Sequence, residues 1–150
     1  MPPRTIWILW FQGWDRAPEI VSACRRSWED LNPGWDVRAL SNAELPHLLG
    51  HDSPLRANAG AWFTPQAHSD LVRIDLLARY GGVLVDATAL CAKPLDDWLP
   101  DVMGSGFFAF DAPAPDRMIS SWFLAFSRVR CGPGVETSVP GLLARPRHGR

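Results

Sequence analysis

The sequence predicts an α/β fold in which a mostly parallel sheet is flanked by helices. Short apolar runs of strand length alternate with segments of helical period, in the order strand, helix, strand, helix. This order is typical of a parallel sheet. A chain of 150 residues has the length of a single domain. Its hydrophobic content of 47% and charged content of 21% are those of an ordinary globular protein.

The first strand and the first helix are predicted near the start of the chain. Residues 5–11 form a continuous apolar run, which favours a strand buried on both faces. Pro18 is suited to the first turn of a helix, and the Asn-Pro-Gly run at 32–34 ends that helix. The apolar positions expected on one face of the helix are Ile20, Val21, Cys24, Trp28 and Leu31.

The next segment predicts a second strand and a short helix. Residues 35–40 alternate enough in polarity to form a strand. Ser41 is a suitable N-cap for a short helix over residues 43–49. Residues 50–65 are polar and interrupted by Gly and Pro, so they are expected to form a loop.

A second long helix, a glycine turn and a third strand are predicted next. The apolar positions that recur at three- and four-residue steps, as on the buried face of a helix, are Ala67, Leu71, Ile74, Leu77 and Ala78. Gly81 and Gly82 stand where a helix C-cap requires a residue tolerant of positive φ. The Val-Leu-Val run at 83–85 then predicts a buried strand that ends at Asp86. A carboxylate in that position is costly unless it meets a cation, hydrogen-bond donors or water.

The rest of the chain contains strand candidates and a tail. Residues 107–110 are a strand candidate, and residues 118–126 fit either a helix or a strand. Residues 128–150 are rich in Arg, Gly and Pro without an apolar period, a composition typical of an unstructured tail. We therefore place one domain in residues 1–127 and a disordered or aberrant tail in residues 128–150.

Asp70, Arg73 and Asp86 are the candidate functional residues. Asp70 and Arg73 are neighbours on a helix surface, and Asp86 ends a strand at the sheet edge where α/β proteins bind ligands. Two carboxylates and a guanidinium in reach of one pocket suit a nucleotide diphosphate-sugar, because guanidinium groups suit phosphate oxygens. The alternative interpretation is a structural Asp70–Arg73 ion pair, with Asp86 capping a turn.

This segment resembles the sugar-binding DXD region of glycosyltransferase family 32 and its capsular polysaccharide synthesis relatives. Those proteins carry the pattern A-x-x-S-D-x-x-R, followed by GG-x-x-x-D-x-D/T. The matching residues of this chain are Ala67, Ser69 (one position closer to the Ala than in some relatives), Asp70, Arg73, Gly81, Gly82, Asp86 and Thr88. The resemblance extends from about Ile6 to about Phe126 and includes the apolar start IWILWFQGW.

The resemblance implies a GT-A type fold with a Rossmann-like half that binds the nucleotide. It also implies transfer of a sugar from a UDP- or GDP-sugar donor to a saccharide acceptor in capsule or cell-surface glycan synthesis, with retention of anomeric configuration. Asp70 would hold donor hydroxyls, and Arg73 and Asp86 are the expected catalytic residues, contacting the diphosphate and the ribose or sugar. Trp10, at the end of the first strand, is expected to stack on the base.

The cofactor that the resemblance implies is a divalent cation, Mn²⁺ or Mg²⁺, held by Asp86 and Thr88. Thr88 stands where the family's second acidic residue is often the direct metal ligand. A neutral hydroxyl in place of a carboxylate lowers the affinity expected for a hard cation.

Composition limits the other partners. A net charge of −1 argues against a nucleic-acid partner, which requires a basic surface. Three widely spaced cysteines without a CxxC pair favour reduced thiols and a cytoplasmic location. No apolar run has the length of a membrane span or a secretory signal, and peripheral association with a membrane synthesis complex stays open.

The end of the resemblance coincides with the start of the tail. Members of the family continue well beyond this point, through segments that build the acceptor side. We therefore expect a truncated chain, and the alternative function is a non-catalytic remnant that binds nucleotide-sugars. A basic tail that contacts anionic lipid is the competing interpretation of residues 128–150.

Overall fold

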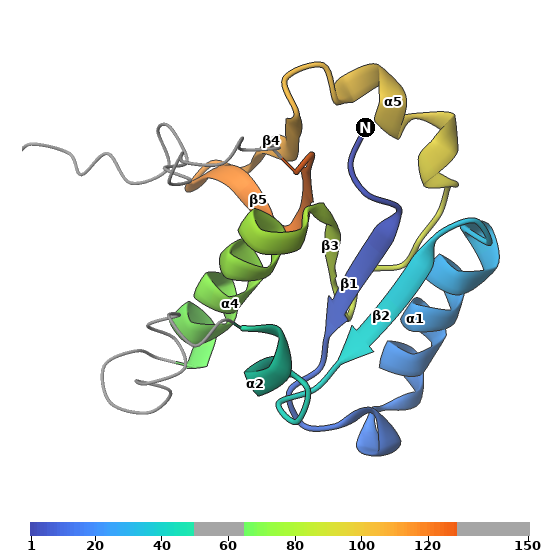
Figure 1. Cartoon of the computed structure of the whole chain (residues 1–150), viewed down its shortest axis with the longest axis vertical. Coiled ribbons are helices and arrows are strands. Elements are labelled where there is room, and N and C mark those ends of the chain that lie inside the picture. The colour runs from blue at the N-terminus through green and yellow to red at the C-terminus, as the bar shows by residue number, and fades with distance from the viewer. Residues whose placement is uncertain (50–64, 129–150) are drawn as a thin grey trace, which may run out of the picture.

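The computed structural model describes residues 1–49 and 65–128 of the chain. The predicted α/β class is confirmed: a five-stranded sheet has the strand order β2-β1-β3-β5-β4 and is flanked by helices (Figure 1). The strands are β1 (Thr5–Leu9), β2 (Asp36–Leu40), β3 (Gly82–Asp86), β4 (Phe107–Ala114) and β5 (Arg117–Phe126). β1 pairs in parallel with both β2 and β3, whereas β5 runs antiparallel to β3 and to β4. The sheet is therefore mostly parallel, and β5 runs opposite to the other strands.

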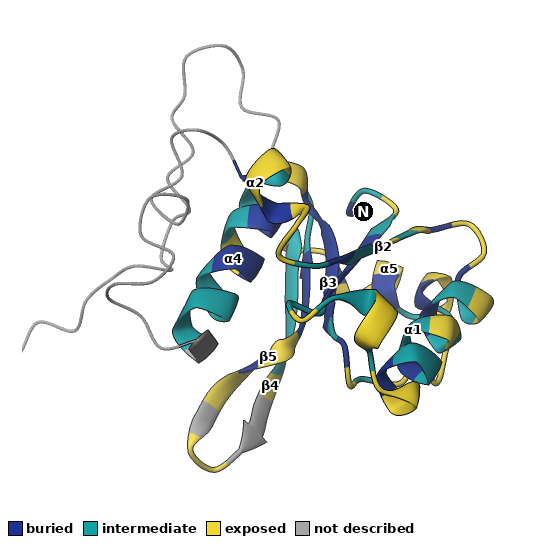
Figure 2. Cartoon of the chain, turned by 90° about the horizontal axis from the view of Figure 1, so that it is seen from below, coloured by how far each residue is buried: buried dark blue, intermediate teal, exposed yellow. Residues whose placement is uncertain are grey.

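Helices lie on both faces of this sheet. They are α1 (Glu19–Leu31), α2 (Leu45–Leu48), α4 (Pro65–Tyr80) and α5 (Leu99–Val102), with short 3-10 turns η1 (Trp14–Arg16) and η2 (Leu95–Asp97). Figure 2 shows α4 against one face of the sheet and α1 and α5 on the other. This layered arrangement is the one expected when helices connect parallel strands.

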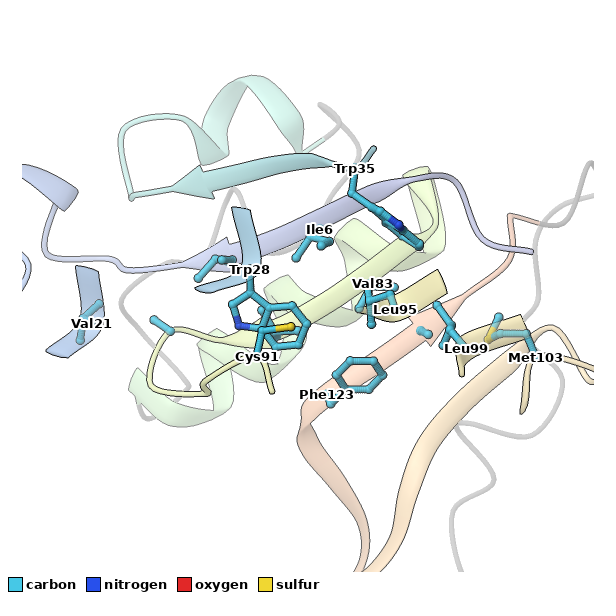
Figure 3. Close-up of a cluster of buried hydrophobic side chains, with 14 residues drawn as sticks. Ile6, Val21, Trp28, Trp35, Val83, Cys91, Leu95, Leu99, Met103 and Phe123 are labelled. Carbon is cyan, nitrogen blue, oxygen red and sulfur yellow. The ribbon is translucent and has the colours of Figure 1, made fainter. Parts of the chain in front are cut away.

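Each face of the sheet has its own buried cluster. In β3, Val83 and Val85 belong to the cluster that faces α1, and Leu84 belongs to the cluster that faces α4. Successive strand residues point to opposite faces, so a continuous apolar run is buried on both, as predicted. Figure 3 shows the first cluster, in which Val83 lies with Trp28 of α1 and Phe123 of β5. The centroids of the Trp28 and Phe123 rings are 6.3 Å apart.

Two predicted helix faces were partly wrong. On α4, Ile74 is 39% exposed, whereas Val72 and Leu76 are fully buried. Val72 and Leu76 are also four residues apart, so the sequence contains two overlapping rows of apolar residues along α4. Contact with the sheet buries the row that contains Val72 and Leu76. On α1, Ile20 is 68% exposed because it lies roughly 100° around the helix from Val21, outside the buried row.

The structure also resolves the ambiguous segments. Residues 118–126 belong to strand β5, because they pair with β3 on one side and β4 on the other. The short helix expected over residues 43–49 is α2, which begins later, at Leu45. Ser41 caps the turn before it: its hydroxyl accepts from the Ala43 amide at 3.3 Å, and its own amide donates to the Glu44 carboxylate at 2.7 Å.

The predicted glycine turn between α4 and β3 is confirmed. Gly81 and Gly82 have φ values of 66° and 103°, and the Gly81 amide donates to the Leu77 carbonyl at 2.8 Å, which closes the helix. A Cβ on Gly82 would lie 2.7 Å from the Thr5 carbonyl oxygen. A residue without a side chain is therefore required there, and the turn places β3 directly beside β1.

Two predictions lie outside the described residues: the loop over most of residues 50–65 and almost all of the tail over residues 128–150. In residues 1–49 and 65–128, no helix has both the length and the apolar character that crossing a membrane requires.

Candidate functional site

The candidate site is centred on an ion pair between α4 and β3. Arg73 projects from α4 toward the sheet, and its Nη2 donates to Oδ2 of Asp86 at 3.0 Å. Arg73 is 8% exposed, and Asp86 is the last residue of β3. β3 pairs with β5 as far as Val85 and with β1 as far as Asp86, so pairing with Leu9 holds the Asp86 backbone. The structure thus brings together two of the three predicted residues.

A second contact of Arg73 reaches strand β5. Its Nη1 donates to the Ser121 carbonyl oxygen at 3.0 Å. Ser121 lies in an irregular stretch of the β4–β5 pairing, where the register shifts between Ala109 and Asp111. The guanidinium therefore joins α4, β3 and β5 at one point. Sequence reasoning missed Ser121, because a backbone acceptor on another strand leaves no signal in residue type.

Thr88 completes the hydrogen bonds of the Asp86 carboxylate. Oδ1 of Asp86 accepts from the Thr88 amide at 2.9 Å and from the Thr88 hydroxyl at 2.7 Å. This is the local turn that Asp forms with a residue two positions later. The alternative interpretation is therefore partly confirmed, because Asp86 caps the turn after β3. It pairs with Arg73 at the same time.

These contacts control the charge of Asp86. Burial alone raises the pKa of this carboxyl, but the hydrogen bonds from Thr88 and Arg73 and the charge of Arg73 outweigh burial. The pKa of Asp86 therefore lies below its ordinary value of 3.8, because the ionised form accepts all three bonds. The site contains a carboxylate and a guanidinium at neutral pH.

Asp70 is not the partner of Arg73. It lies on α4 one turn before Arg73 and is half-buried. Within residues 1–49 and 65–128, the Asp70 carboxylate takes part in no hydrogen bond or ion pair. The alternative Asp70–Arg73 ion pair is therefore not found. Residues at this spacing share one side of a helix, so Asp70 is placed beside the Arg73–Asp86 pair.

Trp10 follows β1 at the same edge of the sheet. Leu9 is in register with Asp86, so the next residue, Trp10, lies at the edge that Asp86 marks. Its half-buried ring contacts the cluster facing α1, and its amide donates to the Leu40 carbonyl at 2.8 Å. In the described part of the chain, Nε1 of Trp10 and Nε of Arg73 are buried without a hydrogen-bond partner. Such orphan donors are rare in folded proteins.

The side chains expected to hold the cation are already engaged with one another. Both oxygens of Asp86 accept hydrogen bonds, and the Thr88 hydroxyl donates its proton to Asp86. In residues 1–49 and 65–128, no group of three or more His, Cys, Asp or Glu residues is arranged so that it could hold a metal ion. Mn²⁺ and Mg²⁺ prefer several anionic oxygens. The described residues therefore do not form a ready-made site for either ion.

Comparison with known proteins gives one family and several relatives. A family described as "Capsular polysaccharide synthesis protein" matches residues 2–131. Inositol phosphoceramide mannosyltransferase 1 of Schizosaccharomyces pombe is 27% identical over 135 residues, which are 82% of this chain and 38% of that protein. O-glycosyltransferase PaGT of Phomopsis amygdali is 27% identical over 139 residues, 81% of this chain and 34% of that protein. Glycosyltransferase afumC of Aspergillus fumigatus is 30% identical over 107 residues, 62% of this chain and 26% of that protein.

The coverage of these matches is uneven. The family match includes every candidate site residue, from Trp10 to Thr88. The chain spans only between 26% and 38% of the length of the curated relatives that it matches. No solved structure matches the chain.

Proposed function

The chain belongs to the capsular polysaccharide synthesis protein family, and we propose that it binds a nucleotide diphosphate-sugar and transfers the sugar to a saccharide acceptor. The observation that carries this proposal is the Arg73–Asp86 pair at the carboxyl end of β3. In open α/β sheets, ligands bind at this end of the strands. The names of the relatives, which include a mannosyltransferase and an O-glycosyltransferase, support sugar transfer as the chemistry.

Each site residue has a proposed role that suits its chemistry. Arg73 contacts the diphosphate, because a planar guanidinium matches phosphate oxygens. Asp86 and Asp70 accept hydrogen bonds from hydroxyls of the ribose or the sugar. Trp10 stacks on the base. The donor is a UDP- or GDP-sugar.

Arg73 is also the proposed source of rate enhancement. Cleavage of the anomeric C–O bond leaves negative charge on the nucleoside diphosphate. A guanidinium held in place before the reaction stabilises that growing charge more than it stabilises the ground state, and this difference accelerates the reaction. Retention of anomeric configuration and synthesis of a capsule or cell-surface glycan are part of the same proposal.

A cytoplasmic location, with peripheral contact to a membrane synthesis complex, completes the proposal. Cys24 and Cys91 are free and buried. Burial raises the pKa of the Cys91 thiol, although hydrogen bonds with Asn32 and Lys93 partly offset this. Free, buried thiols suit a reducing compartment.

Calorimetry with a panel of UDP- and GDP-sugars tests the donor-binding part of this proposal, and transfer or hydrolysis of the bound donor distinguishes an enzyme from a non-catalytic remnant. We expect the wild-type protein to bind at least one donor and Asp86→Ala to lose that binding. Asp75→Ala is the matched control. Asp75 is also a partly buried carboxylate that forms an ion pair with an arginine, since its Oδ2 lies 3.0 Å from Nε of Arg79. The donor affinity of Asp75→Ala should match the wild type. A folded wild-type protein that binds no donor, or equal binding after Asp86→Ala, would refute the proposal.

A further inference from the structure

The Asp86 carboxylate accepts three hydrogen bonds from protein donors. Its Oδ1 accepts two hydrogen bonds from Thr88, at 2.9 and 2.7 Å, and its Oδ2 accepts one from Arg73 at 3.0 Å. These bonds fix the orientation of the carboxylate, and 32% of the side chain stays exposed. A carboxylate has about four acceptor positions, so one position on Oδ2 is left for a ligand. One position suits a donor hydroxyl, but a hard cation prefers several anionic oxygens.

Arg73 cannot easily release its side of this arrangement. Its side chain is almost completely buried between α4 and the sheet, and Nη1 is anchored to the Ser121 carbonyl at 3.0 Å. If Asp86 turned toward a cation, the guanidinium would stay in place with its charge unpaired. A buried charge that loses its partner is strongly unfavourable. Arg73 is therefore a fixed cation supplied by the protein, and Asp86 offsets part of its charge.

Thr88 has a different role from the metal ligand that its position in the motif implies. The Thr88 side chain is exposed, yet its hydroxyl is committed to Asp86. An acidic residue at this position would add a second anionic oxygen and would repel Asp86 instead of donating to it. Threonine does the opposite, since it holds Asp86 in the rotamer that meets Arg73.

We propose that this site binds the diphosphate of its donor without a divalent cation, with Arg73 as the resident positive charge and Thr88 as a positioning residue that orients Asp86. This inference rests on the proposed function and specifies which group of the site offsets the negative charge of the diphosphate. It differs from the cation that the family resemblance implies, because the donor set around Asp86 fits a guanidinium better than a metal ion.

Binding of UDP and GDP, measured with excess EDTA and then with Mn²⁺ or Mg²⁺, tests whether binding requires a cation. We expect the dissociation constant of the nucleotide that binds to agree within about twofold between the buffers. Binding that requires a cation would overturn the inference and leave the proposed function standing. A folded protein that binds neither nucleotide in either buffer would overturn both.

Three variants at position 88 test the positioning role. Thr88→Ser keeps the hydroxyl and should retain wild-type affinity, whereas Thr88→Val keeps the shape and should weaken nucleotide binding roughly three- to tenfold. Thr88→Asp should make binding respond to Mn²⁺ by about tenfold or more, because it adds a second carboxylate. Circular dichroism checks that each variant is folded, as expected for an exposed position. Equal affinity in the Ser and Val variants, or a Thr88→Asp variant as indifferent to Mn²⁺ as the wild type, would contradict the role of Thr88.

Discussion

Arg73 and Asp86 are joined at 3.0 Å although one lies in the middle of a helix and the other at the tip of a strand. The Gly81–Gly82 turn makes this contact possible, because it reverses the chain directly from α4 into β3. The helix is thereby clamped to the sheet at the edge where the sheet can meet a ligand. One ion pair thus contributes both to the stability of the fold and to the proposed site.

Loss of Arg73 should destabilise the protein more than loss of a comparable arginine. Arg73→Gln leaves the half-buried Asp86 without its cation, and we expect a fall of roughly 2 kcal/mol in the free energy of unfolding. Arg79→Gln is the control, because Arg79 forms an (i, i+4) pair with Asp75 on the same helix and such pairs contribute about 0.5 kcal/mol or less. Urea unfolding measures both variants. Equal losses would show that the Arg73–Asp86 pair is not a structural clamp.

Acid should weaken the fold partly through Asp86. The folded-state pKa of Asp86 lies below its ordinary value of 3.8, so the unfolded chain binds the extra proton first as pH falls. The stabilisation is therefore fully present above about pH 4 and is lost as pH falls through the folded-state pKa. Urea unfolding between about pH 2.5 and about pH 6 should show a steeper acid decline for the wild type than for Asp86→Asn. Parallel declines in the two proteins would argue against this coupling.

Asp70 should affect ligand binding without affecting stability. Its carboxylate has no protein partner in residues 1–49 and 65–128, so Asp70→Asn should change the free energy of unfolding by no more than about 0.5 kcal/mol. If Asp70 holds a donor hydroxyl, the same variant should weaken donor affinity roughly three- to tenfold. Calorimetry and urea unfolding on the same samples separate the two effects. Unchanged affinity would remove Asp70 from the site.

Substitution of Gly82 should damage the turn that delivers β3. Gly82→Ala places a Cβ 2.7 Å from the Thr5 carbonyl oxygen, at a φ of 103°, and we expect a loss of about 2 to 4 kcal/mol. Gly104→Ala is the control, because a Cβ there meets nothing within 4 Å. Thermal unfolding should separate the variants by several degrees. A small effect at Gly82 would mean that the backbone can relax without disturbing β1.

Much of the fold was predictable because its signals are local. The apolar runs at 5–11 and 83–85 predict strands buried on both faces. β3 confirms the second, and β1 confirms the first only over Thr5–Leu9, because the strand ends before Trp10. The secondary structure of residues 118–126 was not predictable from their own pattern, because pairing with β3 and β4 makes them a strand. The buried face of α4 was only partly predictable, because its sequence fits two rows and the sheet selects the one with Val72.

The residues of the site were predictable from the sequence, but the contacts between them were not. Spacing placed Asp70, Arg73 and Asp86 near one another, yet Arg73 had two candidate partners and the tertiary structure decides between them. The Ser121 carbonyl leaves no trace in the sequence. The Thr88–Asp86 bonds do have a signal, because Asp followed two residues later by Thr is a known local turn. The motif resemblance instead assigned Thr88 to a metal ion.

The affinity of Arg73→Gln for the nucleotide diphosphate-sugar that the wild type binds is the most direct test of the central claim. If the guanidinium holds the diphosphate, Arg73→Gln should bind at least roughly tenfold more weakly than the wild type, and Arg79→Gln should bind as the wild type does. Equal affinity in wild type and a folded Arg73→Gln variant would contradict the claim that the donor is held at the Arg73–Asp86 pair.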